Sequence, residues 1–372
     1  MSGINSEIDL LNDLENDPEN DPGNDPENRH GFQEVRDMAR TDLWKYCSAE
    51  QCREMMLSFR LIGAGDWPPE KIMGCLYALS NHAEKHYQRV NIPKRSGGFR
   101  TLLVPDPLLK NVQRNLLHHV LDGFTVSDSA AAYRKGASVA ANAGKHQGRK
   151  IVMKMDIEDF FGSITFPMVL HHAFPAAYFP PAVGVMLASL CCCHDRLPQG
   201  APTSPAISNL VMKPFDEYME AWCREREIVY SRYCDDMTFS GVFDGSEVKG
   251  KVYGFLRSMG FEPNLRKTRI LTRGTRQVVT GLVVNERVRV PAPYRRRLRQ
   301  EIYYCMKYGA KEHLTRTGRQ AYLNDGDGGT RRYLESLLGK TAYVLLASGD
   351  GDAWFREAQM KLREMLGQDM CL

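Results

Sequence analysis

The sequence lacks the long apolar segments that a membrane protein requires. None of its apolar runs approaches the roughly 20 residues of a membrane-spanning helix, and the N-terminus lacks the basic and then apolar layout of a signal peptide. The ten cysteines show neither the spacing of a disulfide framework nor the matched pairs of a zinc site, which fits a reducing compartment. We therefore expect a cytoplasmic protein with no membrane partner.

Beyond the N-terminus, acidic side chains are fewer than basic ones. Residues 1–30 contain nine acidic residues and one arginine, and residues 12–28 repeat units such as Asn-Asp-Pro-Glu with a period of four. This repeat offers no apolar surface to pack, so we expect residues 1–30 to form a disordered acidic tail. The remaining chain contains 48 basic and 36 acidic side chains, a balance of +12 that is typical of a polyanion-binding protein.

Two adjacent carboxylates, Asp235 and Asp236, lie in the segment IVYSRYCDDMTFSG over residues 228–241. The flanking runs are rich in β-branched and aromatic residues, which predicts a tight hairpin with the carboxylates at its tip. Adjacent carboxylates repel one another, and Mg²⁺ compensates for this because it prefers hard oxygen ligands. From the dipeptide alone, a solvated turn is the simpler interpretation.

A third carboxylate, Asp156, falls at the end of a predicted strand. In IVMKMDIEDFFGSI, apolar and polar residues alternate from Ile151 to Asp156, and two aromatic residues follow at Phe160 and Phe161. A carboxylate at a strand end beside aromatic residues fits a metal site with an apolar wall. The N-cap of a helix would fit the pattern equally well.

Two further segments predict a basic hairpin and a sharply turning loop. VNIPKRSGGFRTLL over residues 90–103 predicts two strands around a turn at Ser96–Gly98, with cations that could close on phosphates or simply decorate an ordinary hairpin. LPQGAPTSPAISN over residues 197–209 predicts a loop and then a helix from about Ala206. The cysteines at 191–193 are expected in a strand pair before this loop.

Helical periodicity predominates at both ends of the remaining chain. It predicts a helical extension over residues 33–88, a helix over residues 248–259 ended by Gly260, and a bundle of helices after Pro293 with a basic start. Between them, QVVTGLVVNERVRV predicts a hairpin or meander with Asn285–Glu286 in its turn.

A basic segment rich in small residues, over residues 133–150, contains the string N-A-x-x-H at Asn142, Ala143 and His146. By chemistry alone, its Asn and His side chains could cap a helix or contact an RNA backbone.

Taken in order, these segments resemble the conserved blocks of a reverse transcriptase. The blocks are IPKRSGGFRTL, MDIEDFF, LPQGAPTSPAISN, YCDD, NLRKT and VTGLVV, and they cover residues 91–284. The sequence is more particularly similar to bacterial retron reverse transcriptases, through the N-A-x-x-H string and the V-T-G string at residues 279–281. It departs from the family at Cys234, where an alanine is usual.

The resemblance implies an α+β fold with the right-hand polymerase architecture. We expect a helical N-terminal extension over residues 31–90, fingers and an antiparallel palm over residues 91–284, and a helical, RNA-binding thumb over residues 285–372. The 372 residues suffice for two or three such packed units.

By the same resemblance, two Mg²⁺ ions would be held by Asp156, Asp235 and Asp236, with the Ile157 carbonyl completing one site. Mg²⁺ would activate the primer hydroxyl and stabilise the leaving pyrophosphate. Among the nucleotide contacts, the phosphates would meet cations, Phe161 would exclude a 2′-hydroxyl, and a glutamine would touch the sugar and base. The expected nucleotide-binding residues are Lys94, Arg100, Phe161, Gln199 and Lys267.

The family also implies partners. These are a cognate structured noncoding RNA, the dNTPs, a branched RNA-DNA product (multicopy single-stranded DNA) primed from a guanosine 2′-hydroxyl, and a separate effector protein in an antiphage defence system. The expected RNA contacts are Asn142, His146, Thr280, Gly281, Arg295, Arg296, Arg297 and Arg299.

Two alternatives remain. One is a bacterial reverse transcriptase of another clade, although only ~80 residues follow the palm, enough for a thumb without additional domains. The other is a non-enzymatic RNA-binding scaffold that sequesters a toxin. Three carboxylates kept together argue against a scaffold because they repel one another.

Overall fold

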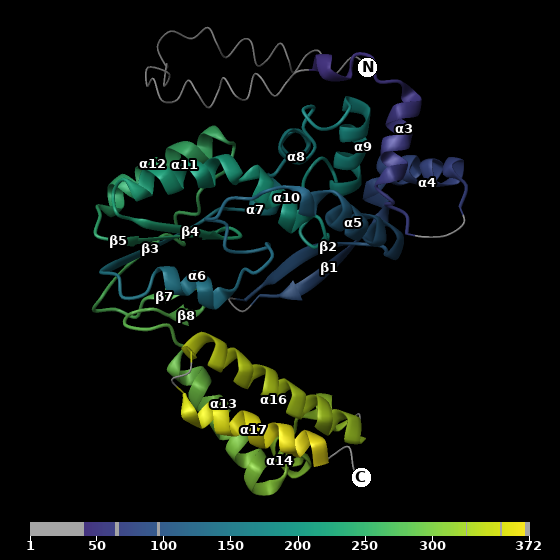
Figure 1. Cartoon of the computed structure of the whole chain (residues 1–372). Coiled ribbons are helices and arrows are strands. Elements are labelled where there is room, and N and C mark those ends of the chain that lie inside the picture. The colour runs from purple at the N-terminus through teal and green to yellow at the C-terminus, as the bar shows by residue number, and fades with distance from the viewer. Residues whose placement is uncertain (1–40, 64–66, 95–96, 325, 350–351, 369–372) are drawn as a thin grey trace.

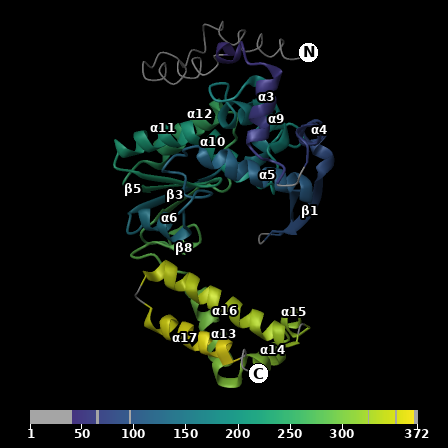
Figure 2. The ribbon, with the colours of Figure 1, turned by 45° about the vertical axis from the view of Figure 1, so that its right-hand side comes forward.

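The computed structural model describes residues 41–63, 67–94, 97–324, 326–349 and 352–368, so the expected acidic tail over residues 1–30 lies outside the described residues. Figure 1 shows a body of helices and strands, with a group of C-terminal helices placed below it. Figure 2, turned by 45°, shows the same separation. No described helix combines the length and the apolar character that a membrane crossing would require.

The described residues from Thr41 to His86 are mainly helical, as their periodicity predicts, while residues 33–40 of the expected extension lie outside the described residues. Ser48 caps helix α3 (Ala49–Ser58), because its side chain accepts from the Gln51 amide while the Gln51 side chain accepts from the Ser48 amide. Buried Met56, Leu76 and Leu79 then pack this region into the main core. The elements are the 3₁₀ helix η1 (Thr41–Trp44), α3 (Ala49–Ser58), α4 (Pro69–Asn81) and the 3₁₀ helix η2 (Ala83–His86).

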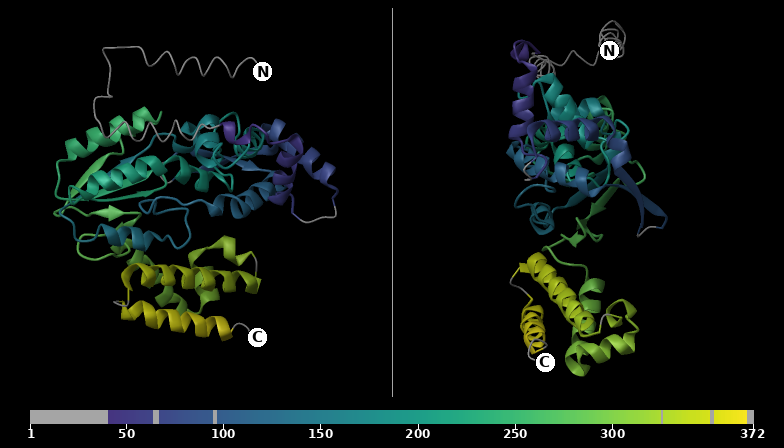
Figure 3. Two further views of the ribbon diagram at one scale, coloured as in Figure 1. Left: turned by 45° about the horizontal axis from the view of Figure 1, so that its top comes forward. Right: turned by 90° about the vertical axis from the view of Figure 1, so that its right-hand side faces the viewer.

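The predicted basic hairpin is present. Strand β1 (Tyr87–Pro93) pairs antiparallel with β2 (Phe99–Pro105). Figure 3, right, shows the hairpin extending away from the body of the molecule. Asp106 ends it by capping α5 (Pro107–His119), accepting from the Leu109 amide. The 3₁₀ helix η3 (Leu121–Gly123) follows.

The central sheet has four antiparallel strands in the order β4-β5-β3-β6. Their register divides the sheet into two chemically different faces, because side chains alternate along a strand. Met153, Met155 and Phe239 lie buried on one face, while Lys154, Asp156 and the residues opposite them lie on the other. The strands are β3 (Ile151–Asp156), β4 (Val229–Tyr233), β5 (Asp236–Gly241) and β6 (Arg269–Thr272).

Helices cover the apolar face of the sheet, and Figure 1 shows α11 and α12 running above it. Phe215, Met219, Val248 and Val252 of these two helices belong to the same buried core as Met153 and Phe239. The remaining helices extend this core toward the N-terminal part. They are α7 (Phe160–Ser163), α8 (Phe166–Ala173), α9 (Pro181–Cys191), α10 (Ser204–Val211), α11 (Lys213–Arg224) and α12 (Gly245–Ser258).

The C-terminal ends of α9 and α12 differ in how well the sequence predicts them. Cys191 is the last residue of helix α9, and Cys193 forms an isolated bridge with Arg196, so the expected strand pair over residues 191–193 is wrong. Helix α12 ends as expected, because Gly260 takes a φ of +80° just beyond its C-terminus.

The polar face is crossed by α6 (Val139–Lys145), which contains Asn142 and is followed by His146. His146 is fully buried, with Nδ1 2.7 Å from Ser240 Oγ and Nε2 2.7 Å from Ser231 Oγ. Asn142 is 2% exposed. The expectation that Asn142 and His146 contact RNA is therefore wrong for this structure, where His146 fastens α6 to β4 and β5.

A small meander lies next to α6. Strand β7 (Val278–Val279) turns at Thr280–Gly281 into β8 (Leu282–Val283), and Val283 then bridges Arg289 around the expected turn at Asn285–Glu286. Thr280 Oγ1 donates to the Val139 carbonyl at 3.1 Å, which ties the meander to α6.

The C-terminal helices form a second buried core. Leu298, Ile302, Tyr333, Leu337 and Phe355 lie at its centre, and Val279 and Leu282 of the meander belong to it. The apolar contacts therefore join the meander to this bundle. Its helices are α13 (Ala292–Tyr308), α14 (Ala310–Thr317), α15 (Gln320–Leu323), α16 (Gly326–Ser348) and α17 (Ala353–Gln368).

The buried His146 predicts a specific loss of stability in acid. Burial lowers its folded-state pKa to about 3, whereas the unfolded chain titrates near the ordinary value of about 6.5. The unfolded state thus binds the extra proton between these values, and stability falls as pH drops below about 6.5. This group alone should make the protein about 2 kcal/mol less stable at pH 5 than at pH 7.

Denaturant unfolding at the two pH values measures this effect. The variant His146→Gln should be less stable than the parent protein at pH 7 but should lose about 2 kcal/mol less on acidification. His82→Gln, at another exposed histidine, is the matched control and should leave the difference in stability between the two pH values unchanged. An unchanged acid sensitivity in His146→Gln would contradict the burial of an uncharged imidazole.

Candidate active site

Three carboxylates meet where β3 ends and the β4–β5 hairpin turns. Asp156, the last residue of β3, lies directly opposite Asp236, the first residue of β5. Asp235 lies in the turn itself, and its carbonyl accepts from the Ile157 amide at 3.3 Å. The sequence predicted the strand end and the hairpin tip separately, and the sheet brings them together.

Two lysines pair with two of the three carboxylates. Lys267, from the loop before β6, places Nζ 2.8 Å and 3.0 Å from the two carboxylate oxygens of Asp156. Lys154, one pleat before Asp156 on the same face, places Nζ 2.8 Å from Asp236 Oδ2. Lys154 was not among the expected site residues, although its position two residues before a strand-end aspartate was a usable signal.

The carboxylates are electrostatically strained. Burial raises the pKa of Asp156, the Lys267 hydrogen bond opposes this, and the charge of Asp235 raises it further. Burial also raises the pKa of Asp236, against the opposing charge of Lys154. The hydrogen bond to Asp156 in turn raises the pKa of Lys267. Positive charge at this point therefore stabilises the ionised aspartates.

The donor chemistry fits a hard divalent cation. Carboxylate oxygens crowded on a partly buried surface are the ligands that Mg²⁺ prefers. Among the described residues, however, no group of three His, Cys, Asp or Glu side chains is arranged to hold a metal ion. In this arrangement, the two ammonium groups supply the positive charge that a cation would otherwise bring.

The turn between β4 and β5 is held in an unusual backbone conformation. Cys234 takes a φ of +62°, a left-handed value that costs a non-glycine residue about 1 kcal/mol or more. Its thiol is 9% exposed, and burial raises its pKa to about 11, so the thiol stays protonated. The Tyr133 hydroxyl lies 3.4 Å from Cys234 Sγ as a hydrogen-bond donor.

Phe161 lies one turn beyond Asp156, at the start of α7. The backbone bends there at Asp159, whose φ is +41°. A Cβ on Gly162 would meet the Asp159 carboxylate, which would have to move. Phe161 is half-buried and its ring lies 5.3 Å from that of buried Phe160, measured between centroids. Packing against Phe160 thus restrains the ring of Phe161.

The other expected nucleotide contacts lie on the hairpin and on the loop beside it. Lys94 and Arg100 are exposed on the β1–β2 hairpin. The Gln199 carbonyl accepts from the Leu103 amide at 2.8 Å, which fastens the loop before α10 to strand β2. Gly200 makes this approach possible, because a Cβ on it would lie 2.9 Å from the Leu103 carbonyl oxygen.

The expected thumb cations divide into two groups. Arg295 and Arg299 both pair with Asp352, just before α17, whereas Arg296 and Arg297 are exposed. Thr280 and Gly281 lie at the turn between β7 and β8, where Thr280 is partly exposed and Gly281 is exposed.

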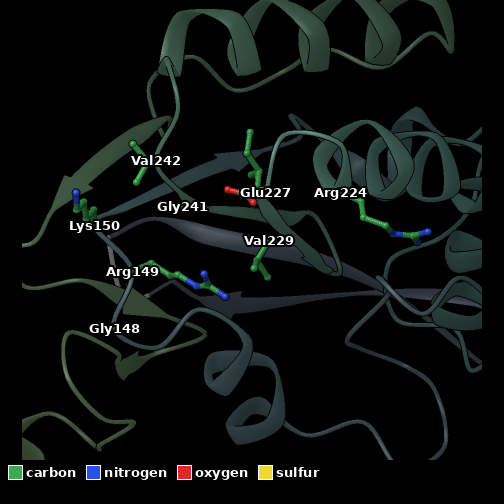
Figure 4. Close-up of a pocket in the computed structure, with 9 residues that line it drawn as sticks. Gly148, Arg149, Lys150, Arg224, Glu227, Val229, Gly241 and Val242 are labelled. Carbon is green, nitrogen blue, oxygen red and sulfur yellow. The ribbon is translucent and has the colours of Figure 1, made fainter.

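A cavity of about 630 Å³ lies away from the carboxylates. It opens beside Gly148–Lys150, immediately before β3, at the opposite end of the strand from Asp156. Figure 4 shows Arg149 and Glu227 among the side chains around it. The cavity therefore does not mark the carboxylate site.

Comparisons with known proteins agree with this arrangement. The family model described as reverse transcriptase (RNA-dependent DNA polymerase) matches residues 92–304, which is more than half of the chain. Retron Mx65 reverse transcriptase of Myxococcus xanthus is 36% identical over 59% of this chain and 56% of its own length. Retron Ec86 reverse transcriptase of Escherichia coli is 30% identical over 65% of this chain and 76% of its own length.

Among solved structures, telomerase from Candida tropicalis aligns with a TM-score of 0.41 and 13% identity, over 82% of this chain and 68% of that one, which is too weak a likeness to support an argument. The chain spans only about half the length of Mx65, but three quarters of Ec86. The family match and the Ec86 similarity together show that this chain belongs to the reverse transcriptase (RNA-dependent DNA polymerase) family, as a member of its retron type.

Proposed function

We propose that this chain is an RNA-directed DNA polymerase that extends DNA on an RNA template. The observation that supports this most directly is the convergence of Asp156, Asp235 and Asp236 on the polar face of the sheet, with two cations against them. A pure scaffold gains nothing from such a cluster, because mutual repulsion and burial make it costly.

Mg²⁺ is the cation that this donor set suits, and we propose that two ions bind there with the carboxylates of Asp156, Asp235 and Asp236 and the Ile157 carbonyl as ligands. When bound, the metal would lower the pKa of the primer hydroxyl and stabilise charge on the leaving pyrophosphate. Lys267 pairs with Asp156 in this structure. Once released from that carboxylate, its ammonium group can donate to the departing phosphate oxygens.

The residues around the cluster would select and hold the dNTP. Lys94 and Arg100 would contact its phosphates from the β1–β2 hairpin, and Gln199 would touch its sugar and base. Phe161, restrained by Phe160, would occupy the space that a ribose 2′-hydroxyl needs. In this scheme, residues 91–284 supply the fingers and palm, residues 285–372 supply the thumb, and residues 31–90 form a helical extension.

We further propose a retron-type reaction. The relatives are named as retron reverse transcriptases, which supports a cognate structured noncoding RNA as template and a guanosine 2′-hydroxyl as primer. The exposed Thr280–Gly281 turn and the cations Arg296 and Arg297 are candidate RNA contacts, with Arg295 and Arg299 held nearby by Asp352. A cytoplasmic location, an effector protein and an antiphage role complete the proposal.

Substitution of the turn carboxylate tests the polymerase assignment. Asp235→Asn removes a charge that metal binding requires, so DNA synthesis on an RNA template should fall at least about 1000-fold while RNA binding is retained. Primer extension and filter binding measure the two quantities. Asp244→Asn is the matched control, because asparagine caps α12 as well as aspartate does. Full-length DNA from Asp235→Asn would refute the assignment.

Removal of the Phe161 ring tests nucleotide selection. Phe161→Ala opens space for a 2′-hydroxyl, so the efficiency of ribonucleotide incorporation relative to dNTP should rise by about tenfold or more. Competition between labelled CTP and dCTP measures this ratio. Phe161→Tyr keeps the ring and should keep the parent discrimination. A Phe161→Ala variant that still discriminates fully would show that another residue excludes the ribose.

The nucleic acid that copurifies with the protein tests the priming reaction. We expect DNA joined to RNA through a 2′,5′ linkage, because priming from a guanosine 2′-hydroxyl leaves that bond. Treatment with RNase and then with a debranching enzyme should release a DNA of defined length. Linear DNA that is unaffected by debranching would rule out the retron-type reaction while leaving the polymerase assignment intact.

A further inference from the structure

Arg232 is an arginine buried completely on the helix-covered side of the sheet, inside strand β4. Its charge is matched by Asp216 of α11, which is equally buried: Nε lies 2.9 Å from Oδ1 and Nη2 lies 2.6 Å from Oδ2. A bidentate pair of this kind satisfies the charge of the guanidinium. The third guanidinium nitrogen, Nη1, takes no part in this ion pair.

That nitrogen reaches the catalytic turn. Arg232 Nη1 donates to the carbonyl oxygen of Cys234 at 2.9 Å, one residue before Asp235. Charge compensation does not require this contact, because Asp216 already provides it. The contact fixes the peptide group that joins Cys234 to Asp235, and so restrains the direction in which the Asp235 side chain leaves the turn.

Further hydrogen bonds close a ring around the same turn. Arg232 Nη2 also donates to Asn209 Oδ1 at 3.1 Å, and Asn209 Nδ2 donates to the Ala132 carbonyl at 2.9 Å. The next residue, Tyr133, donates its hydroxyl to Cys234 Sγ. The path therefore runs from Arg232 through Asn209 and Tyr133 to Cys234, and returns to Arg232 through the Cys234 carbonyl.

The backbone of Arg232 holds the same two segments together. Its amide donates to the Ser129 carbonyl at 2.8 Å, and its carbonyl accepts from the Ala131 amide at 2.7 Å. These bonds form the parallel bridge between Ala130 and Arg232. Side chain and backbone of one residue thus fix both the turn and the segment that leads to Tyr133.

The backbone conformations show what the ring restrains. Tyr133 and Cys234 both take left-handed φ values, +58° and +62°. Such conformations persist in non-glycine residues only where the surroundings over-determine them, and they concentrate at functional sites. Here the two strained residues touch each other, and Tyr133 is 47% exposed beside the carboxylates.

We propose that Arg232 is a positioning residue for the polymerase reaction, which holds the turn presenting Asp235 through a ring of hydrogen bonds with Asn209, Tyr133 and Cys234. Arg232 does not touch substrate in this scheme. It keeps the Asp235 carboxylate aligned with Asp156, and the ring extends the same restraint to the exposed Tyr133. This inference rests on the proposed polymerase function.

The test compares Arg232→Lys with Tyr230→Phe. Lysine keeps a positive charge for Asp216 but cannot reach Asp216 and the Cys234 carbonyl together. Tyr230→Phe removes a buried hydrogen bond of 2.8 Å to the same Asp216 carboxylate, yet leaves the ring untouched, so it controls for general destabilisation. Both variants are assayed for kcat and for KM of the dNTP in primer extension.

A second readout does not depend on activity. The rate at which a maleimide alkylates Cys234, followed by mass spectrometry of the peptide, reports how often the turn opens. We expect Arg232→Lys to lower kcat and to raise the alkylation rate, each by about fivefold or more, as the loss of one buried hydrogen bond implies, with little change in KM. Tyr230→Phe should change neither quantity, although it lowers the unfolding midpoint.

An Arg232→Lys protein with the parent kcat and alkylation rate would overturn the proposal, as would a Tyr230→Phe protein that shows the same losses. If the wild-type protein makes no DNA, the proposed polymerase function fails, while the alkylation rates still decide whether Arg232 holds the turn.

If Arg232→Lys does not fold, a cycle of Tyr133→Phe, Cys234→Ala and the double variant decides. Phenylalanine keeps the exposed ring and removes only the hydroxyl. We expect the effects of the two single variants on kcat and on the free energy of unfolding to be non-additive, because both remove one shared bond. Additive effects would contradict the Tyr133–Cys234 link and so overturn the proposal.

Discussion

Repulsion among three carboxylates is the constraint on which this structure depends. Asp156, Asp235 and Asp236 are brought to one end of the sheet by strand register, and two of them are sufficiently buried for their pKa values to rise. The sheet meets this cost by placing Lys154 and Lys267 on the same face. The other face, under the helices, carries most of the buried apolar residues of the sheet, while Val152 on the polar face packs into the second core.

The division between the two faces also explains how α6 is held. A buried imidazole between Ser231 and Ser240 is a polar contact within the polar face, and it continues the row of side chains that ends at the aspartates. The histidine of the N-A-x-x-H string thus holds α6 against the polar face of the sheet. The meander and the C-terminal helices pack beside it as a second core.

Local patterns were predictable from the sequence, and long-range partners were not. The strand ending at Asp156, the hairpin around Asp235 and the helix ending before Gly260 follow from alternation, turn chemistry and helical periodicity. The helix that ends at Cys191 was not predicted, because α9 is buried over most of its circumference and so shows no amphipathic period. His146 misled because its serine partners lie 85 and 94 residues away.

The site itself was predictable in part, by resemblance and not by pattern. The roles expected of Asp156, Asp235 and Asp236 came from the order of the family's blocks, and the structure shows these residues together. Arg232 carried no signal, because strand alternation alone places it among apolar residues, where an arginine is unfavourable without a partner. Its partners Asp216 and Asn209 come from two separate helices, and only the folded chain identifies them.

The close approach of Gly200 to Leu103 has a mechanical consequence. Because the Gln199 carbonyl and the Leu103 amide are bonded near the base of the hairpin, the loop and the hairpin are held together at that point. The cations Lys94 and Arg100 lie toward the tip of the hairpin. A small rotation of the hairpin about the bond to Gln199 would therefore displace them much farther than it displaces Gln199. A nucleotide held by both would be gripped firmly at its base and adjustably at its phosphates.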